Sequence, residues 1–392
     1  MTIKTLIEAG EDTYRAAILE DDIAVSFSVI PKAGDATGAI YLARVKRVDP
    51  KINAAFLDLG DAGDAFLPYR QAKALKSKLS ANISGLVHEG EKILVKIVAP
   101  STDHDKLPLA TANPMIAGRY ALSGHLKGKA TVARSIAEGE KRQALEELLE
   151  ESHNGNALII RSAAANAPKD LVQAEIEKQQ AMWETLEGSD QEPGLVMPAP
   201  DPMEQILRDF APPHVDEILV EGSVAFLAAK KIADQKWPDL KGKVARFDEG
   251  KIMDAFGVEE RLEGVTSGVV PLPSGGDIRI EETAAMTVID VNSGAGRKGT
   301  SPGALHLSTN LEATLVIARE VRFQNLFGLV TVDFIDMRTP EDREKVTGAL
   351  RSELNKDNLP VETTGINRFG ILTIKRARRG QNLKTLLEHF AT

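Results

Sequence analysis

AAMTVIDVN (residues 284–292) and GLVTVDFIDM (residues 328–337) are two apolar runs that predict buried β-strands. The residues between them carry one helical pattern, and strands joined by one helix usually lie side by side in a sheet. Each run contains an aspartate, Asp290 in the first and Asp333 in the second. An ionised carboxylate among apolar neighbours costs several kcal/mol unless it is paired or binds a metal ion. These strands therefore predict an α/β unit that carries a charged site, and residues 268–282 before them predict a hairpin around residues 274–276.

Two carboxylates on adjacent strands, with no His or Cys beside them in the sequence, favour a hard cation with oxygen ligands. We therefore expect Asp290 and Asp333 to bind Mg²⁺, with Mn²⁺ as the alternative ion and no zinc. Alternation along a strand places Asn292 on the same face as Asp290. The competing interpretation is that each aspartate caps a turn or pairs with Arg322 or Arg368.

Two further expectations concern the neighbourhood of the second aspartate. Asp336 is expected to face away from Asp333, because alternate residues of a strand face opposite ways, and to be structural or to support the metal ligands without binding the ion. The preceding helix is expected to span residues 310–327, since Thr309 followed by Glu312 is typical of a capped helix start.

A glycine-rich segment, SGAGRKG (residues 293–299), follows the first aspartate strand. It contains G-x-G-x-x-G, which leaves a dinucleotide-binding oxidoreductase open as an alternative. The match is weak, because residues 300–303 intervene before a helix and Asp290 would repel a pyrophosphate. A glycine loop with Arg297 and Lys298 can hold an RNA phosphate equally well.

The chain has 392 residues, a net charge of −9 and no cysteine, which excludes disulfides, thiolate zinc sites and cysteine nucleophiles. No secretory signal pattern and no apolar run near the ~20 residues of a membrane span occur, so we expect a soluble, cytoplasmic protein. The acidic total argues mildly against nucleic-acid binding. Residues 368–384 nevertheless form a local basic stripe.

Upstream of the aspartate strands the pattern changes several times. Residues 39–117 contain many short strands between turns, which predict a small barrel such as an OB-fold. Residues 118–200 contain two helices and a strand and end in a Pro-rich stretch. Residues 203–264 form an α/β layer too small to stand alone, and we expect the strands of residues 1–30 to complete it.

Two pairs of residues in these upstream segments are candidates for RNA contacts. Phe56 and Phe66 lie near strand ends of the predicted barrel, where exposed aromatics stack bases at about 1–3 kcal/mol each. The alternative is that both are core residues. Arg161 and Ser162 end a strand, and a guanidinium beside a hydroxyl makes a good phosphate clamp. The alternative for this pair is an ordinary surface Arg beside a loop.

These motifs together resemble the catalytic half of the bacterial ribonuclease E/G family over nearly the whole chain. The block AIYLARVKRVDPKINAAFLDLGDAGDAFLPY (residues 39–69) is similar to the S1 domain of that family. The most specific matches are TVIDVNSGAGRKG (287–299), STNLEATLVIAREVR (308–322), GLVTVDFIDM (328–337), LPSGGDIRIEETAAMTVID (272–290) and NRFGILTIKRAR (367–378).

The resemblance implies a multidomain α/β and β architecture. An RNase H-like domain would be split between residues 1–35 and 201–264. An S1 barrel with the OB-fold (36–117) and a 5′-sensor region (118–200) would be inserted into it. A DNase I-like catalytic domain would follow at residues 265–392.

The resemblance also implies the activity, a Mg²⁺-dependent endoribonuclease of RNA processing and decay. Single-stranded RNA would be cleaved by metal-activated water to give 5′-phosphate products. Asp290 and Asp333 match the metal ligands of the family, and Asn292 matches a nearby Asn. A non-catalytic RNA-binding protein that keeps the fold is the rival interpretation, and the retained aspartates speak against it.

The RNA contacts implied by the resemblance lie in three places. In the barrel they are Phe56, Phe66 and Lys106. In the 5′-monophosphate pocket they are Arg161 and Ser162, with Ser where the family is expected to have Thr. In the catalytic domain we expect the RNA backbone to contact Arg297, Lys298 and Arg368.

The chain departs from the family in its assembly elements. The Cys pair that shares a zinc between subunits cannot exist without cysteine. The small domain and the long partner-binding tail of the family are also not found in this sequence. We therefore expect a minimal form, without a zinc-linked tetramer or a degradosome scaffold and without a membrane partner, which leaves a homodimer open.

Overall fold

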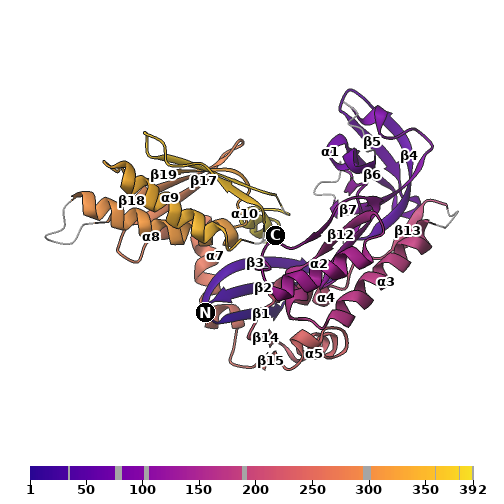
Figure 1. Cartoon of the computed structure of the whole chain (residues 1–392), viewed down its shortest axis with the longest axis horizontal. Coiled ribbons are helices and arrows are strands. Elements are labelled where there is room, and N and C mark those ends of the chain that lie inside the picture. Colours follow the sequence, from indigo (N-terminus) through magenta and orange to yellow (C-terminus); the bar gives the residue numbers. More distant parts are fainter. Residues whose placement is uncertain are drawn as a thin grey trace. The chain divides into compact units, whose positions relative to one another are not determined.

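The computed structural model describes residues 1–33, 36–75, 82–100, 106–187, 192–294, 302–357, 359–378 and 380–390. The chain forms two compact units, each built from separate stretches of sequence (Figure 1). The first unit comprises Met1–Ile30, Val215–Phe226 and Ala245–Thr392. The second comprises Pro31–His214 and Leu227–Val244. The finer division into five domains stays a prediction.

The first unit contains a five-stranded sheet that joins the N-terminus to a distant part of the chain. Its strand order is β15-β14-β1-β2-β3, with β1 and β14 parallel. The expectation that the N-terminal strands complete a later α/β layer is therefore confirmed for these strands. The strands are β1 (Ile3–Ala9), β2 (Thr13–Glu20), β3 (Ile23–Pro31), β14 (Glu217–Glu221) and β15 (Val244–Phe247).

The first unit also contains a six-stranded sheet with the order β16-β17-β18-β19-β21-β20. The pair β18–β19 is parallel, as expected of strands joined by one helix, and the hairpin predicted around residues 274–276 is present as β16–β17. The helices α8 and α9 pack with these strands (Figure 1) around a core that includes Ile289 and Val332. The strands are β16 (Val269–Pro271), β17 (Asp277–Glu282), β18 (Thr287–Asn292), β19 (Gly328–Asp333), β20 (Val361–Thr363) and β21 (Ile371–Arg376).

The helix between β18 and β19 differs from its prediction. Within the described residues α8 spans Pro302–Phe323, so it starts earlier and ends earlier than expected. Thr309 and Asn310 are buried inside it, with exposed fractions of 2% and 0%. The predicted capping box at Thr309 is therefore wrong, because tertiary packing uses these polar residues inside the helix. The other helices of this unit are α6 (Ile252–Ala255), α7 (Val258–Ser267), α9 (Pro340–Leu354) and α10 (Leu383–Phe390).

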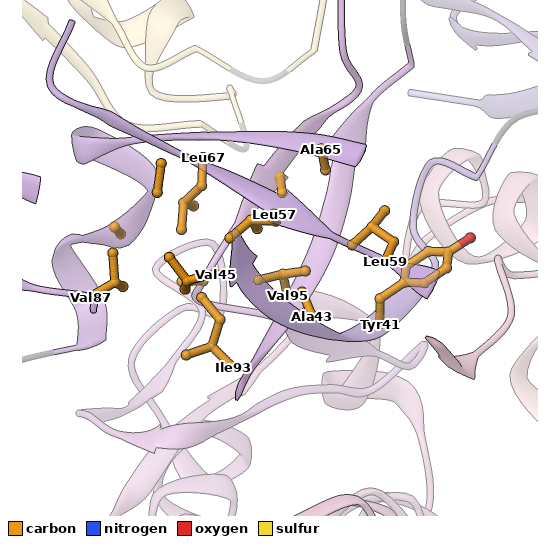
Figure 2. Packing of buried hydrophobic residues seen from close by; sticks show 14 of the residues in the cluster. Tyr41, Ala43, Val45, Leu57, Leu59, Ala65, Leu67, Val87, Ile93 and Val95 are labelled. Carbon is orange, nitrogen blue, oxygen red and sulfur yellow. The ribbon is translucent and has the colours of Figure 1, made fainter. Parts of the chain in front are cut away.

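The second unit contains the predicted small barrel. Five strands in the order β4-β5-β6-β8-β7 close through pairing of β4 with β7, and β13 (Gly194–Met197) pairs with β4 from outside. Alternate side chains such as Val45, Leu57 and Val95 fill the interior (Figure 2). The barrel strands are β4 (Ile40–Asp49), β5 (Ala54–Asp58), β6 (Asp64–Pro68), β7 (Lys92–Ala99) and β8 (Leu109–Thr111).

The rest of the second unit is a four-stranded sheet, in the order β11-β12-β10-β9, with its helices. Arg119, which is fully buried, donates to the Asp239 carboxylate at 2.5 Å, and the Tyr120 hydroxyl donates to it at 2.7 Å. This network joins the sheet to the segment after α5. The elements are β9 (Met115–Ala117), β10 (Ala121–Lys127), β11 (Ala130–Val132), β12 (Asn156–Ile160), α1 (Tyr69–Ala72), α2 (Glu140–Ser152), α3 (Lys169–Glu187), α4 (Pro202–Phe210) and α5 (Ser223–Lys236).

Candidate functional site

The two candidate metal ligands lie directly across from each other. The register of the parallel pair matches Asp290 of β18 with Asp333 of β19, near the carboxyl ends of both strands. Adjacent strands are about 4.8 Å apart, so the two carboxylates start from neighbouring backbone positions. Both side chains are exposed. The predicted adjacency of the two strands is thus confirmed, and it brings the aspartates together on one face.

The exposure of both aspartates corrects the sequence argument that their carboxylates are buried among apolar residues. Their apolar neighbours Ile289, Val291 and Val332 face the core, whereas the aspartates occupy the opposite, exposed face. The expected cost of burying a carboxylate among apolar residues is therefore wrong for both positions. Strand alternation alone separates these side chains from the residues beside them.

The arginines named in the competing interpretation contact other groups. Arg322 donates to the Glu20 carboxylate at 2.7 Å. The Arg368 guanidinium lies over the ring of Phe369, 4.7 Å from its centroid. Neither contact involves Asp290 or Asp333, so the observed geometry does not support neutralisation of the aspartates by these two arginines.

Asn292 lies on the same face as Asp290, as strand alternation predicts. Its side-chain amide donates to Asp290 Oδ2 at 2.9 Å and to Asp277 Oδ1 at 3.3 Å. Asn292 thus orients one carboxylate of the pair and joins it to a third. Sequence reasoning missed Asp277, although counting pairs outward from the turn between Glu282 and Thr287 would have placed it opposite Asn292.

Asp336 lies closer to the pair than the strand pattern predicts. The strand β19 ends at Asp333, so alternation does not extend to Asp336, and its expected placement away from Asp333 is wrong. The Oδ1 atoms of Asp333 and Asp336 lie 3.6 and 3.9 Å from the position that a Cβ on Gly370 would occupy. Loss of solvent contact, and then the charges of Asp290 and Asp336, raise the pKa of the Asp333 carboxyl.

Hydrogen bonds to α8 and to Gly370 help to fix the segment that follows Asp333. The buried Asn310 side chain of α8 donates to the Ile335 carbonyl at 2.8 Å and accepts from the Ile335 N–H at 3.1 Å. The Phe334 N–H donates to the Gly370 carbonyl at 3.2 Å. The sequence pattern predicts Asn310 at the helix start. Buried polar side chains usually have a hydrogen-bond partner, so an Asn among the apolar residues of a helix could have suggested a partner outside the helix.

The donor set fits magnesium better than zinc. Magnesium is usually held by one or two carboxylates, keeps several waters and takes further oxygens from phosphate. Asp290 and Asp333 supply two such carboxylates, with Asp336 near the second. Zinc usually takes Cys or His ligands, and the pair here consists of carboxylates. Among the described residues no group of three or more His, Cys, Asp or Glu side chains surrounds a metal position, so waters or phosphate oxygens would complete the coordination shell.

The residues expected to hold the RNA backbone are only partly placed. Arg297 and Lys298 lie outside the described residues. Arg368 lies in the connection between β20 and β21, two residues before Gly370. Because Ile371 pairs with Asp333, this connection reaches the sheet edge where the aspartates lie.

The barrel residues form one aromatic group outside the barrel core. Phe56 and Phe66 pair across β5 and β6, with ring centroids 5.8 Å apart in an edge-to-face arrangement. The Arg47 guanidinium lies 4.3 Å from the centroid of the Phe56 ring. Both rings are half-buried and do not belong to the buried core, so the alternative that they are core residues is wrong. Lys106 is exposed, two residues before Pro108, whose carbonyl accepts from the Phe66 N–H.

The candidate 5′-phosphate pair lies elsewhere in the second unit. Arg161 donates to the Gly118 carbonyl at 2.6 Å and to the Asp209 carboxylate at 2.8 Å. The strand β12 ends at Ile160, so Arg161 follows the strand instead of ending it, and Ser162 begins the short helical turn Ser162–Asn166. The guanidinium is thus fixed by two partners, and a phosphate would have to share it with Asp209.

Comparisons with known proteins agree with this arrangement. Residues 115–379 match the model of the Ribonuclease E/G family. The chain is 31% identical over 373 residues to a protein named Ribonuclease G of Haemophilus influenzae, a match that covers 89% of this chain and 74% of that protein. It is 30% identical to Ribonuclease E of a Nostoc species over 98% of this chain, and 29% identical to Ribonuclease E of Escherichia coli over 89%.

The chain corresponds to only part of the longer relatives. The match covers 57% of the Nostoc protein and 34% of the Escherichia coli protein. Within the part of the chain that the structure describes, the helices lack the combination of length and apolar character needed to cross a membrane.

Proposed function

Because the chain belongs to the ribonuclease E/G family, we propose that it is a magnesium-dependent endoribonuclease that cleaves single-stranded RNA. The observation that carries the proposal is the matched pair of exposed aspartates on β18 and β19, which offers two oxygen ligands from one edge of a sheet. The names of the relatives support an RNA substrate. The expected products carry a 5′-phosphate and a 3′-hydroxyl.

The site residues divide the work as follows. Asp290 and Asp333 would hold Mg²⁺, which when bound supplies Lewis-acid polarisation of a phosphate and a water of lowered pKa. Asn292 keeps the Asp290 carboxylate oriented through its 2.9 Å hydrogen bond. Arg368 is exposed on the same edge and can bind a phosphate oxygen through its guanidinium. Asn310 keeps the backbone after Asp333 in place.

Recognition of unpaired RNA is assigned to the second unit. The half-buried rings of Phe56 and Phe66 offer faces for stacking, which tolerates any base sequence and needs single strands. Arg47 and Lys106 add positive charge near these rings, although the whole chain has a net charge of −9. Arg161 and Ser162 are proposed to bind a 5′-monophosphate in competition with Asp209.

The central test is cleavage of a short single-stranded RNA by three variants. Asp290→Asn and Asp333→Asn should each abolish Mg²⁺-dependent cleavage and leave RNA binding nearly intact. Glu281→Gln is the matched control. It neutralises an exposed carboxylate of β17 whose cross-strand partner, Val288, lies two residues before Asp290 in β18. Full activity in either aspartate variant, with measured folding like wild type, would refute the assignment.

A second comparison separates the nuclease from a binding protein that keeps the fold. The wild-type chain should cleave in Mg²⁺ and not in EDTA, whereas a pure binding protein would retain RNA without cleaving it under both conditions. The same RNA with a 5′-monophosphate or a 5′-triphosphate then tests the pocket at Arg161. A preference for the monophosphate should disappear in Arg161→Ala.

A further inference from the structure

The connection between β20 and β21 ends in a rigid tip made of Arg368, Phe369 and Gly370, here called the 368–370 tip. The Asn367 N–H donates to the Ile371 carbonyl at 2.9 Å, and the Gly370 N–H donates to the Asn367 carbonyl at 3.2 Å. The Asn367 side-chain oxygen accepts from the N–H groups of Phe369 (2.8 Å) and Ile371 (3.1 Å). A short turn with this many internal hydrogen bonds holds its backbone, and hence the Cα–Cβ directions of its residues, in place.

Gly370 allows this tip to lie against the strand that carries Asp333. Its φ of +84° favours glycine, and a Cβ there would come within 2.9 Å of the Phe334 carbonyl oxygen. The same Cβ position is 3.6 Å from Asp333 Oδ1. Phe369 is the adjacent residue, so its backbone lies beside the proposed metal ligands.

Phe369 holds its ring in solvent at this position. Its exposed fraction is 66%, although burial of a Phe side chain typically contributes about 1.5–3 kcal/mol. Single exposed apolar residues are common on protein surfaces and need no explanation by themselves. This ring differs because its backbone is fixed, because the next residue, Gly370, lies beside Asp333, and because the Arg368 guanidinium lies 4.7 Å from its centroid.

We propose that Phe369 stacks on an unpaired base of the RNA, next to the phosphate at the aspartate pair, while Arg368 binds the adjoining phosphate. This rests on the proposed nuclease function and deepens it. Base stacking on an aromatic ring contributes about 1–3 kcal/mol and accepts every base. Bases within a duplex are already stacked and cannot occupy such a ring. The 368–370 tip would therefore select single strands at the cleavage site itself.

The test measures binding of a short fluorescein-labelled single-stranded RNA by anisotropy, with Ca²⁺ as an ion that takes the same oxygen ligands and with EDTA in parallel. A gel checks that the RNA stays intact. Phe369→Ala should weaken binding about tenfold, equivalent to about 1.4 kcal/mol. Phe369→Trp should bind like wild type, because the larger ring still stacks.

A matched control exists at the opposite end of β19, the strand that ends at Asp333. The Arg378 guanidinium lies over the ring of Phe327, 4.5 Å from its centroid, and Phe327 directly precedes β19. Phe327→Ala removes an equivalent arginine–aromatic contact away from the aspartates and should leave RNA affinity unchanged. Thermal melting of both variants checks that the fold is intact.

RNAs that lack one base at a defined position give the decisive comparison. With the base next to the scissile bond removed, wild type and Phe369→Ala should bind equally, whereas with other bases removed the tenfold difference should remain. An equal loss for every RNA, or an unchanged affinity in Phe369→Ala, would overturn the stacking proposal. Failure of the nuclease assignment would appear separately, as cleavage by Asp290→Asn or Asp333→Asn.

Discussion

Replacing Asn310 by alanine is expected to lower both the stability of the first unit and its rate of RNA cleavage. The Asn310 side chain is fully buried and bonds both backbone groups of Ile335, at 2.8 and 3.1 Å. Alanine at position 310 removes both hydrogen bonds at once. The segment between Asp333 and Asp336 then loses its hydrogen bonds to Asn310 and keeps the 3.1 Å contact between His306 Nδ1 of α8 and the Asp336 carbonyl.

The size of the effect follows from these two hydrogen bonds. A buried polar group without a partner costs about 1–3 kcal/mol. Ile335 is only half-buried, so water reaches part of the exposed backbone, and we expect about 2–3 kcal/mol for the two groups together. For a domain of this size the melting temperature falls by roughly 2–4 °C per kcal/mol, which gives a decrease of about 4–12 °C.

The effect on cleavage comes from the position of the carboxylates. A displacement of about 1 Å at a reacting group can cost about a hundredfold in rate. We therefore expect kcat to fall at least about tenfold in Asn310→Ala at a temperature where the variant is still folded. Calorimetry gives the melting temperature, and cleavage of a fluorogenic single-stranded RNA gives the rate.

Thr314→Val is the control for the loss of a buried polar group in α8. Thr314 is also fully buried, but its hydroxyl donates only to Leu311 of the same helix, at 2.7 Å. Its replacement should cost at most about 1 kcal/mol and leave kcat unchanged. An Asn310→Ala variant that melts like wild type, or that loses stability without losing rate, would refute the proposed link between Asn310 and the aspartates.

Three further substitutions test other parts of the chain. Asp239→Asn leaves Arg119 charged and buried without its carboxylate, so urea denaturation should show a loss of about 3–5 kcal/mol. Burial lowers the pKa of His125, so the unfolded chain binds the proton more readily than the folded chain. The free energy of unfolding should therefore fall as pH drops below about 6.5. Urea denaturation at pH 5 and pH 8 should show a smaller difference for His125→Phe than for wild type. Gly370→Ala places a Cβ 2.9 Å from the Phe334 carbonyl at a positive φ, and should cost about 1–2 kcal/mol from the backbone alone and reduce kcat in the same RNA assay.

Local patterns in the sequence predicted the parts of the fold that depend on local physics. The glycine turn at residues 274–276 predicted the β16–β17 hairpin, and the short strands between residues 39 and 117 predicted the barrel. One helical pattern between two apolar runs predicted the parallel pair β18–β19. In each case the spacing of apolar residues or a turn residue determines the element.

Features that depend on contacts distant in sequence were not predictable in this way. Thr309 and Glu312 have the spacing of a helix start, yet α8 continues through them. Asn310 between them is a helix residue whose side chain donates to the carbonyl of Ile335, which is distant in sequence. Asp336 lies near Asp333 because β19 ends where the chain contacts Gly370, and periodicity cannot indicate where a strand stops.

The sequence argument for the aspartate pair rested on the cost of burying a carboxylate among apolar residues, which the structure corrects. Repulsion between the two carboxylates is a different cost. Like charges directly opposite each other destabilise neighbouring strands, and the register places Asp290 opposite Asp333. Arg279 of β17 lies opposite Asp290 on its other side, but the Arg279 guanidinium pairs with the Asp277 carboxylate at 3.4 Å. Repulsion between the two carboxylates, together with the partial loss of solvent contact at Asp333, is thus what a divalent cation would relieve at this edge. A local arrangement that opposes folding is expected mainly where a ligand compensates for it, so the case for a cation at this edge survives the loss of the burial argument.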